Sequence, residues 1–201
     1  MPLNIVVLIK QVPDMNAVKI DRTAGKPVLS GQLVVSSFDE YAIEEAIRLK
    51  DAHGGEITVV CAGPTSAKDA ITRALAMGAD KGVHLLVSDT SGVDTLALAT
   101  ALSGFLSGLA FDLVLFGQNS DDSMTGHVGP QVAELFGLPH VSSVTKVTVA
   151  DRHLTVARDT EDGKQTVELD LPAVLLAMTG LNEPRYPSLK GIMAAKKKPI
   201  D

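Results

Sequence analysis

The chain has 201 residues, of which 45% are hydrophobic, and this suffices for one substantial α/β domain with an added piece, or for two small domains. The formal net charge of −6 and the absence of tryptophan argue against a general nucleic-acid binder. The single cysteine, Cys61, excludes an internal disulfide and fits a reducing compartment, and the first apolar run, Ile5 to Ile9, is too short for a signal peptide or a membrane span.

Short apolar runs that end in turn-forming residues predict the buried strands of a parallel sheet. They cover residues 3–9, 57–61, 83–87 and 112–116. Helical patterns lie between them, after Ser37, from about Ser66 and over 96–106, and a further helix with Pro130 in its first turn follows the fourth strand. Strands and helices that alternate with short links predict a doubly wound, mostly parallel sheet.

Two other segments of this half have weaker patterns. Residues 18–33 predict an irregular excursion or a hairpin, and Ser88 to Val93 predict a polar connector. Ser37 and Glu40 have the spacing of a capping box, in which the hydroxyl and the carboxylate would each pair with an amide at the helix start.

The pattern changes after Pro139. Residues 142–149, 154–159 and 166–171 are rich in alternating or β-branched residues, with Asp162-Gly163 as a hairpin turn. They predict a small antiparallel or mixed β appendage over about residues 141–171, and residues 173–178 predict a return to the main sheet. We therefore expect a single domain with its main sheet in about residues 1–140 and 172–179, followed by a partner-recognition segment over about residues 180–198.

The loop after the fourth strand is the main candidate for a binding site. From Gly117 to Val128 it is polar and contains glycine, and it leads into the N-terminus of a helix. Loops at the carboxyl ends of parallel strands bind ligands in open α/β sheets, and free amides at a helix start suit a phosphate. The alternative is that the loop binds nothing, since neither GxxxxGK[ST] nor GxGxxG occurs in the chain.

The C-terminal segment offers a second candidate. Two prolines flank Arg185 and Tyr186, and a short helix from Ser188 would place Leu189, Ile192 and Met193 on one face. That face either packs on the parent domain or stays exposed for a partner.

No pattern of residues predicts catalysis. The five histidines are scattered without metal-ligand spacing, and there is no GxSxG motif and no plausible cysteine nucleophile. A nucleotide-like loop without a reactive set predicts binding without turnover, so we expect no metal and no enzyme activity.

Several stretches together resemble one family, the β subunit of electron transfer flavoprotein. They are NIVVLIKQVPD (4–14), SSFDEYAIEEAIRLK (36–50), AGPTSAKDAITRALAMGADKGVHL (62–85), LVLFGQNSDD (113–122) and, most specifically, LNEPRYPSLKGIMAAKKK (181–198). The resemblance covers essentially the whole chain. It implies a Rossmann-like sheet of the adenine nucleotide α-hydrolase type and a heterodimer with an α subunit.

The resemblance also implies cofactors and partners. FAD would be held mostly by the α subunit at the interface, and the β subunit would bury one structural AMP. Electrons would pass from acyl-CoA or other flavin dehydrogenases to a membrane-bound quinone oxidoreductase or another acceptor. The expected location is the cytoplasm of a bacterium or, for a eukaryote, the mitochondrial matrix.

By the same resemblance, site residues are carried over position by position. The AMP contacts would be Leu8, Ser36, Ser37, Phe38, Asp39, Ala62, Gly117, Gln118, Asn119, Ser120, Asp121, Asp122, Ser123, Met124, Thr125, Gly126, His127 and Val128. The partner-recognition residues would be Arg185, Tyr186, Leu189, Ile192 and Met193, with Leu189 as the anchor in a dehydrogenase pocket. Asp159 would pair with the α subunit.

Three alternatives stay open at this point. One is an electron-bifurcating relative with a second FAD in place of AMP. Another is an adenine-nucleotide-binding protein that acts alone. The third is an interaction module without a nucleotide.

Overall fold

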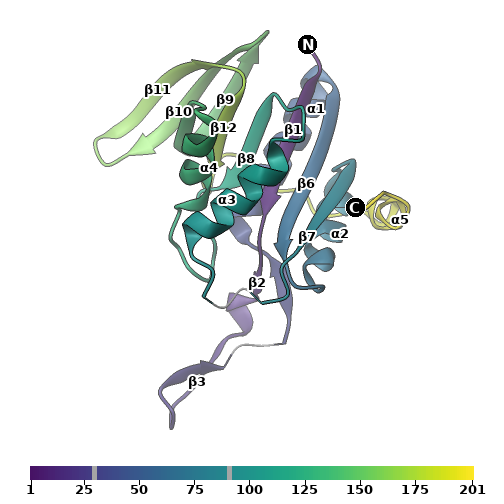
Figure 1. The fold of residues 1–201 in the computed structure, drawn as a ribbon, viewed down its shortest axis with the longest axis vertical. Coiled ribbons are helices and arrows are strands. Elements are labelled where there is room, and N and C mark those ends of the chain that lie inside the picture. Colours follow the sequence, from purple (N-terminus) through teal and green to yellow (C-terminus); the bar gives the residue numbers. More distant parts are fainter. Residues whose placement is uncertain (29–30, 90–91) are drawn as a thin grey trace.

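A single mixed sheet forms the centre of the computed structural model, which describes residues 1–28, 31–89 and 92–201 (Figure 1). Within these residues the sheet has eight strands in the order β11-β10-β9-β12-β8-β1-β6-β7. Strands β12, β8, β1, β6 and β7 are parallel to their neighbours in that series, as the alternation of strands and helices predicts. The α/β fold class expected from the sequence is therefore confirmed.

The strands of this main sheet are, in chain order, β1 (Leu3–Ile9), β6 (Gly55–Gly63), β7 (Lys81–Leu86), β8 (Leu113–Gly117), β9 (His140–Ala150), β10 (His153–Thr160), β11 (Gly163–Asp170) and β12 (Ala173–Ala177). The helices are α1 (Ser37–His53), α2 (Ala67–Met77), α3 (Thr95–Leu106), α4 (Val128–Phe136) and α5 (Leu189–Ala195). Helices α3 and α4 cover one face of the sheet, and α1 and α2 cover the other (Figure 1).

Strand β1 shows why both faces need helices. Its side chains alternate, so that Ile5 and Val7 belong to the core under α1 and α2, while Val6 and Leu8 belong to the core under α3 and α4. All four are at most 4% exposed. A continuous apolar run of this kind is stable only in a strand that is buried on both sides.

The predicted β appendage is a continuation of the main sheet. β9, β10 and β11 are antiparallel to one another, as expected, but β9 also pairs in parallel with β12, with Val174 opposite His140. The three strands therefore extend the main sheet on one side instead of forming a separate layer.

A polar excursion leaves the sheet after β1. β2 (Gln11–Pro13) pairs with β5 (Leu33–Val35), and the 3-10 helix η1 (Met15–Ala17) follows β2. β3 (Lys19–Asp21) and β4 (Lys26–Val28) form the expected hairpin, which projects from the body of the molecule (Figure 1). Residues 29–30 of this excursion and residues 90–91 of the predicted polar connector lie outside the described residues.

The C-terminal residues return to the sheet. After α5, the amide of Gly82 donates to the carbonyl of Pro199, and the amide of His84 donates to the carbonyl of Asp201. Residues 199–201 thus run beside β7, the outermost strand on this side. Of the helices that the structure describes, none has both the length and the apolar character that crossing a membrane requires.

Candidate functional site

The loop after β8 lies at the carboxyl edge of the parallel strands, where the sequence places the binding site. Leu8 of β1 is in register with Phe116 of β8 and with Val60 of β6. The predicted contacts Leu8, Ala62 and Gly117 are therefore at nearly the same height on three adjacent strands. The topology brings together residues that are far apart in the sequence.

Asp39, in the first turn of α1, ties two of these strands together. One carboxylate oxygen accepts the amide of Lys10 at 2.7 Å, and the other accepts the amide of Gly117 at 3.0 Å. Burial raises the pKa of Asp39 to about 7, although both amides favour the ionised form. A Cβ at position 117 would lie 2.5 Å from an Asp39 carboxylate oxygen, so this close approach requires glycine.

The start of α1 differs from the predicted capping box. Ser36 is the N-cap and makes no side-chain capping bond, and Glu40 accepts a hydrogen bond from Arg73 instead of reaching back. The acceptor comes from the loop: the Asp121 carboxylate accepts the Ser37 amide at 2.7 Å and the Ser37 hydroxyl at 2.6 Å. The capping-box prediction is wrong because this carboxylate, 84 residues away, satisfies the helix start.

The loop is held by its own polar side chains and by Lys10. The Lys10 ammonium donates to Asp122 at 2.8 Å, and the Ser120 hydroxyl donates to the same carboxylate at 2.8 Å. Burial acts to raise the pKa of Asp122, but the hydrogen bonds from Lys10 and Ser120 outweigh burial, and the pKa is lowered. The two acidic residues of the loop are thus both compensated within the chain.

The second half of the loop faces outward, at the N-terminus of α4. Ser123, Met124, Thr125 and His127 are exposed, and the His127 side chain makes no capping bond to α4. Gly126 adopts a φ of +63°, and a Cβ there would lie 2.8 Å from the Asn119 side-chain oxygen. This half therefore presents backbone and small polar groups beside a helix N-terminus, an arrangement that suits a phosphate.

The C-terminal segment lies against α1 and α2. Arg185 is held by Glu44 of α1, with its Nε 2.8 Å and its Nη2 2.9 Å from the two carboxylate oxygens. Tyr186, Leu189, Ile192 and Met193 are 88%, 77%, 45% and 64% exposed. Of the two alternatives for the face of α5, packing on the parent domain and exposure, the structure has the exposed arrangement.

A hollow of ≈ 750 Å³ brings the two candidate regions near one another. Ser37 at the start of α1 and Asp121 of the loop after β8 line it together with Tyr186 of the C-terminal segment. Residues 14–16 at η1, the residues of β5, Glu40 of α1 and residues of α2 complete its wall.

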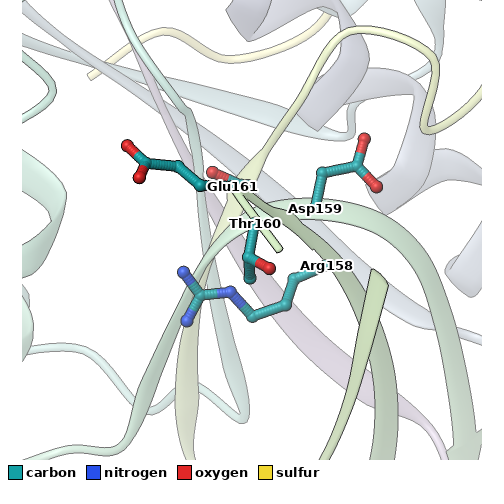
Figure 2. A pocket seen from close by; sticks show the side chains of 5 residues that line it. Arg158, Asp159, Thr160 and Glu161 are labelled. Carbon is teal, nitrogen blue, oxygen red and sulfur yellow. The ribbon is translucent and has the colours of Figure 1, made fainter. Parts of the chain in front are cut away.

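Asp159 lies at a different end of the sheet. It lines an open hollow of ≈ 550 Å³ with Ser143, Arg158, Thr160 and Glu161, near the turn between β10 and β11 (Figure 2). Figure 2 shows the Asp159 carboxylate directed away from the Arg158 guanidinium. The side chain of Asp159 is 51% exposed, and Lys164 lies 3.8 Å from its carboxylate. A role in pairing with another subunit stays a prediction.

Comparison with known proteins identifies the family. The electron transfer flavoprotein domain matches residues 28–201 of the chain. The electron transfer flavoprotein subunit beta of Thermoanaerobacterium thermosaccharolyticum is 43% identical over 197 residues, which are 98% of this chain and 76% of the relative. The proteins of the same description from Syntrophomonas wolfei and Bacillus subtilis are 44% and 39% identical, over 100% and 99% of this chain and 79% and 78% of their own length.

The chain belongs to the family of electron transfer flavoprotein β subunits.

Two features of this electron transfer flavoprotein chain were missed by sequence reasoning. Lys10 follows the first strand and anchors the loop through Asp122, and Glu44 and Glu45, on α1, are only 5% and 4% exposed. The sequence contained a signal for the burial of these glutamates. They fall among Ala42, Ile43, Ala46 and Ile47, so the helical period places their carboxylates beside the apolar face of α1. Their partners could not be found by spacing, because Arg185 is 141 residues away from Glu44.

Proposed function

We propose that this β subunit pairs with an α subunit and holds AMP at the loop after β8 as a structural group. It would also help to form an FAD site whose main contacts come from the α subunit. In this assembly electrons pass from a flavin dehydrogenase to a membrane-bound quinone oxidoreductase or to another acceptor. The family assignment supports the flavin association, and the loop supports the nucleotide.

The charge balance of the loop is the observation that carries the AMP proposal. The Asp121 carboxylate accepts the Ser37 amide at the start of α1, and the Asp122 carboxylate accepts a hydrogen bond from the Lys10 ammonium. A phosphate at the start of α4 would therefore meet two carboxylates that are already compensated. The Met124 amide donates to the carbonyl of Ser120 within the loop. The rest of the backbone from Thr125 to Val128 lies next to a helix N-terminus without a side-chain cap from His127, where it could meet a phosphate.

The chain itself would contribute positioning and not reaction chemistry. FAD, when bound, supplies the redox chemistry, and this subunit would hold the nucleotide loop and one wall of the interface in place. The partner-recognition role proposed for the exposed residues of the C-terminal segment fits this division, because they lie on an outer surface of the chain.

Cofactor content tests the proposal. The purified heterodimer is denatured, and the released FAD and AMP are separated by chromatography and counted against protein. Equal amounts of FAD and AMP, one of each per heterodimer, are expected. Two FAD and no AMP would instead favour the electron-bifurcating type of subunit, and absence of any nucleotide would leave only the interaction module. A subunit that stays monomeric and hydrolyses nucleotides would favour the adenine-nucleotide protein that acts alone.

A further inference from the structure

The exposed apolar side chains of the C-terminal segment sit between two buried anchor points. We call Tyr186, Leu189, Ile192 and Met193 the apolar patch. Leu181, before the patch, is 8% exposed, and Ala195, after it, is 3% exposed. The patch is thus the middle of a segment fastened at both ends to the helices of one face of the sheet (Figure 1).

The first fastening is a two-bond fork between the half-exposed side chain of Arg185 and the buried side chain of Glu44. Besides the two bonds from its guanidinium, Arg185 donates its own backbone amide to Glu44 at 3.1 Å. Glu44 is only 5% exposed, and Asp51 lies farther from the guanidinium, at 3.6 Å. A planar guanidinium with two parallel bonds fixes direction as well as distance. The fork therefore sets the course of the chain immediately before Tyr186.

Asn182 strengthens the same anchor point. Its side-chain amide donates to the carbonyl of Tyr41 and to the carboxylate of Glu45, each at 3.0 Å. Both acceptors belong to α1, one turn apart. Helix α1 thus binds the segment at two positions, at Asn182 and again three residues later at Arg185.

The second fastening joins α5 and the residues after it to α2. A Cβ at Gly191 would overlap the carbonyl oxygen of Ala76, so α5 lies directly on the end of α2. The Lys198 ammonium donates to the carbonyls of Leu75 and Ala79. A cation at these carbonyls complements the C-terminal end of α2.

These fastenings have an energetic consequence for binding. A loose segment must lose conformational freedom when a partner orders it, whereas a segment that is already fixed does not. The Arg185 side chain is 42% exposed, so this ion pair is screened by solvent on one side and contributes little net stability. The fork is thus better explained by the arrangement it imposes on the patch than by stability.

We propose that Glu44 is a positioning residue for partner recognition: through Arg185 it holds the apolar patch in the one arrangement that docks on a flavin dehydrogenase. This inference rests on the proposed function, in which Leu189 anchors that contact. It adds a residue of α1 that never touches the partner.

The test replaces Glu44 by glutamine in the intact heterodimer. The amide turns an N–H donor toward the donors of Arg185 and breaks the fork without changing side-chain size. Using a purified acyl-CoA dehydrogenase reduced by its substrate as the electron donor, we expect the KM for the heterodimer to rise about tenfold, the scale of a lost preorganised contact. The kcat and the flavin content should be unchanged. Cleavage by trypsin after Arg185 should become faster, because the side chain is released.

Asp51→Asn is the matched control, because it removes the same charge from the more distant and more exposed neighbour of Arg185. It should leave the KM within about twofold of the wild type, as expected for an exposed ion pair. If Glu44→Gln does not assemble, Arg185→Lys keeps the charge and loses the fork, and it should raise the KM in the same direction.

A double-mutant cycle separates positioning from general damage. In a Leu189→Ala background, Glu44→Gln should add little to the KM, because the side chain it positions has gone. Additive effects, or a wild-type KM for Glu44→Gln, would overturn the inference alone. A wild-type KM for Leu189→Ala would overturn the proposed recognition role and this inference with it.

Discussion

Asp39 shows at the scale of one residue how the loop site depends on burial. Its carboxyl has a folded pKa of about 7, whereas an aspartate in the unfolded chain titrates at about 3.9. Between these values the folded chain keeps a proton that the unfolded chain has lost. The contribution of Asp39 to stability is therefore complete below about pH 4 and is lost as the pH rises through about 7.

Replacing Asp39 by asparagine should remove this pH dependence. We expect the free energy of unfolding, measured by urea denaturation from about pH 5 to about pH 8, to fall less steeply with pH in Asp39→Asn than in the wild type. Asp21→Asn is the control: hydrogen bonds from Ala24 and Thr23 lower the pKa of Asp21, so its titration lies below this range. Parallel curves for Asp39→Asn and the wild type would show that burial does not raise this pKa.

The elements that sequence patterns predicted well are those whose neighbours matter least. β1, β8 and β12 were predicted from apolar runs, because a strand buried on both faces needs a continuous run of apolar residues whichever strands lie beside it. The pairing of β9 with β12 could not be predicted, since alternation indicates a strand and not its neighbour. The capping box failed for a related reason: spacing within α1 contains no information about Asp121.

The candidate site was predictable as a location and less so as a geometry. A polar loop after a buried strand indicated the carboxyl edge of the sheet, and the loop lies there. That Asp39 joins Lys10 to Gly117, and that Glu44 holds Arg185, depends on contacts between distant segments. Such contacts leave no local pattern in one sequence.

The loop after β8 is the element on which nucleotide content should depend. In Gly126→Val a β-branched residue would have to adopt the left-handed φ of position 126, and its side chain would approach Asn119. Both effects would distort the loop where the phosphate is proposed to bind. We expect heterodimers of this variant to lose most of their AMP and to assemble in lower yield. AMP is measured by mass spectrometry of the denatured protein.

Gly25→Val controls for strain alone. Gly25, in the turn of the β3–β4 hairpin, has a nearly identical φ of +64°, but among the described residues no atom lies within 4 Å of the place that a Cβ would take there. This variant should keep its AMP. Normal AMP content in Gly126→Val would place the phosphate elsewhere.

At the scale of the whole molecule, the nucleotide loop and the apolar patch approach each other where Asp121 and Tyr186 line one hollow, but Leu189 is not among the residues that line it, and we expect the two regions to have separate tasks. Leu189→Ala should therefore raise the KM for reduction by an acyl-CoA dehydrogenase about tenfold or more, as for truncation of a central contact residue, while the flavin content stays intact. Steady-state reduction kinetics and the flavin absorbance measure the two quantities.

Leu96→Ala is the control for Leu189→Ala. Leu96 is an exposed helical leucine on α3, and α3 covers the opposite face of the sheet from α1 and α2. Its truncation should leave reduction unchanged. Loss of flavin in Leu189→Ala would instead show that α5 supports the cofactor.

The residues that follow α5 also cover an edge of the main sheet that could otherwise pair with another copy of the chain. β7 would otherwise offer a row of amides and carbonyls on which a strand of another chain could grow, and residues 199–201 occupy that row at Gly82 and His84. β11 forms the other edge of the sheet and, within the described residues, pairs only with β10. Its charged side chains Lys164, Glu168 and Asp170 discourage pairing with a strand of another chain along that edge. Cutting the chain after Lys198 would thus expose the unpaired backbone groups at the edge of β7 and favour aggregation.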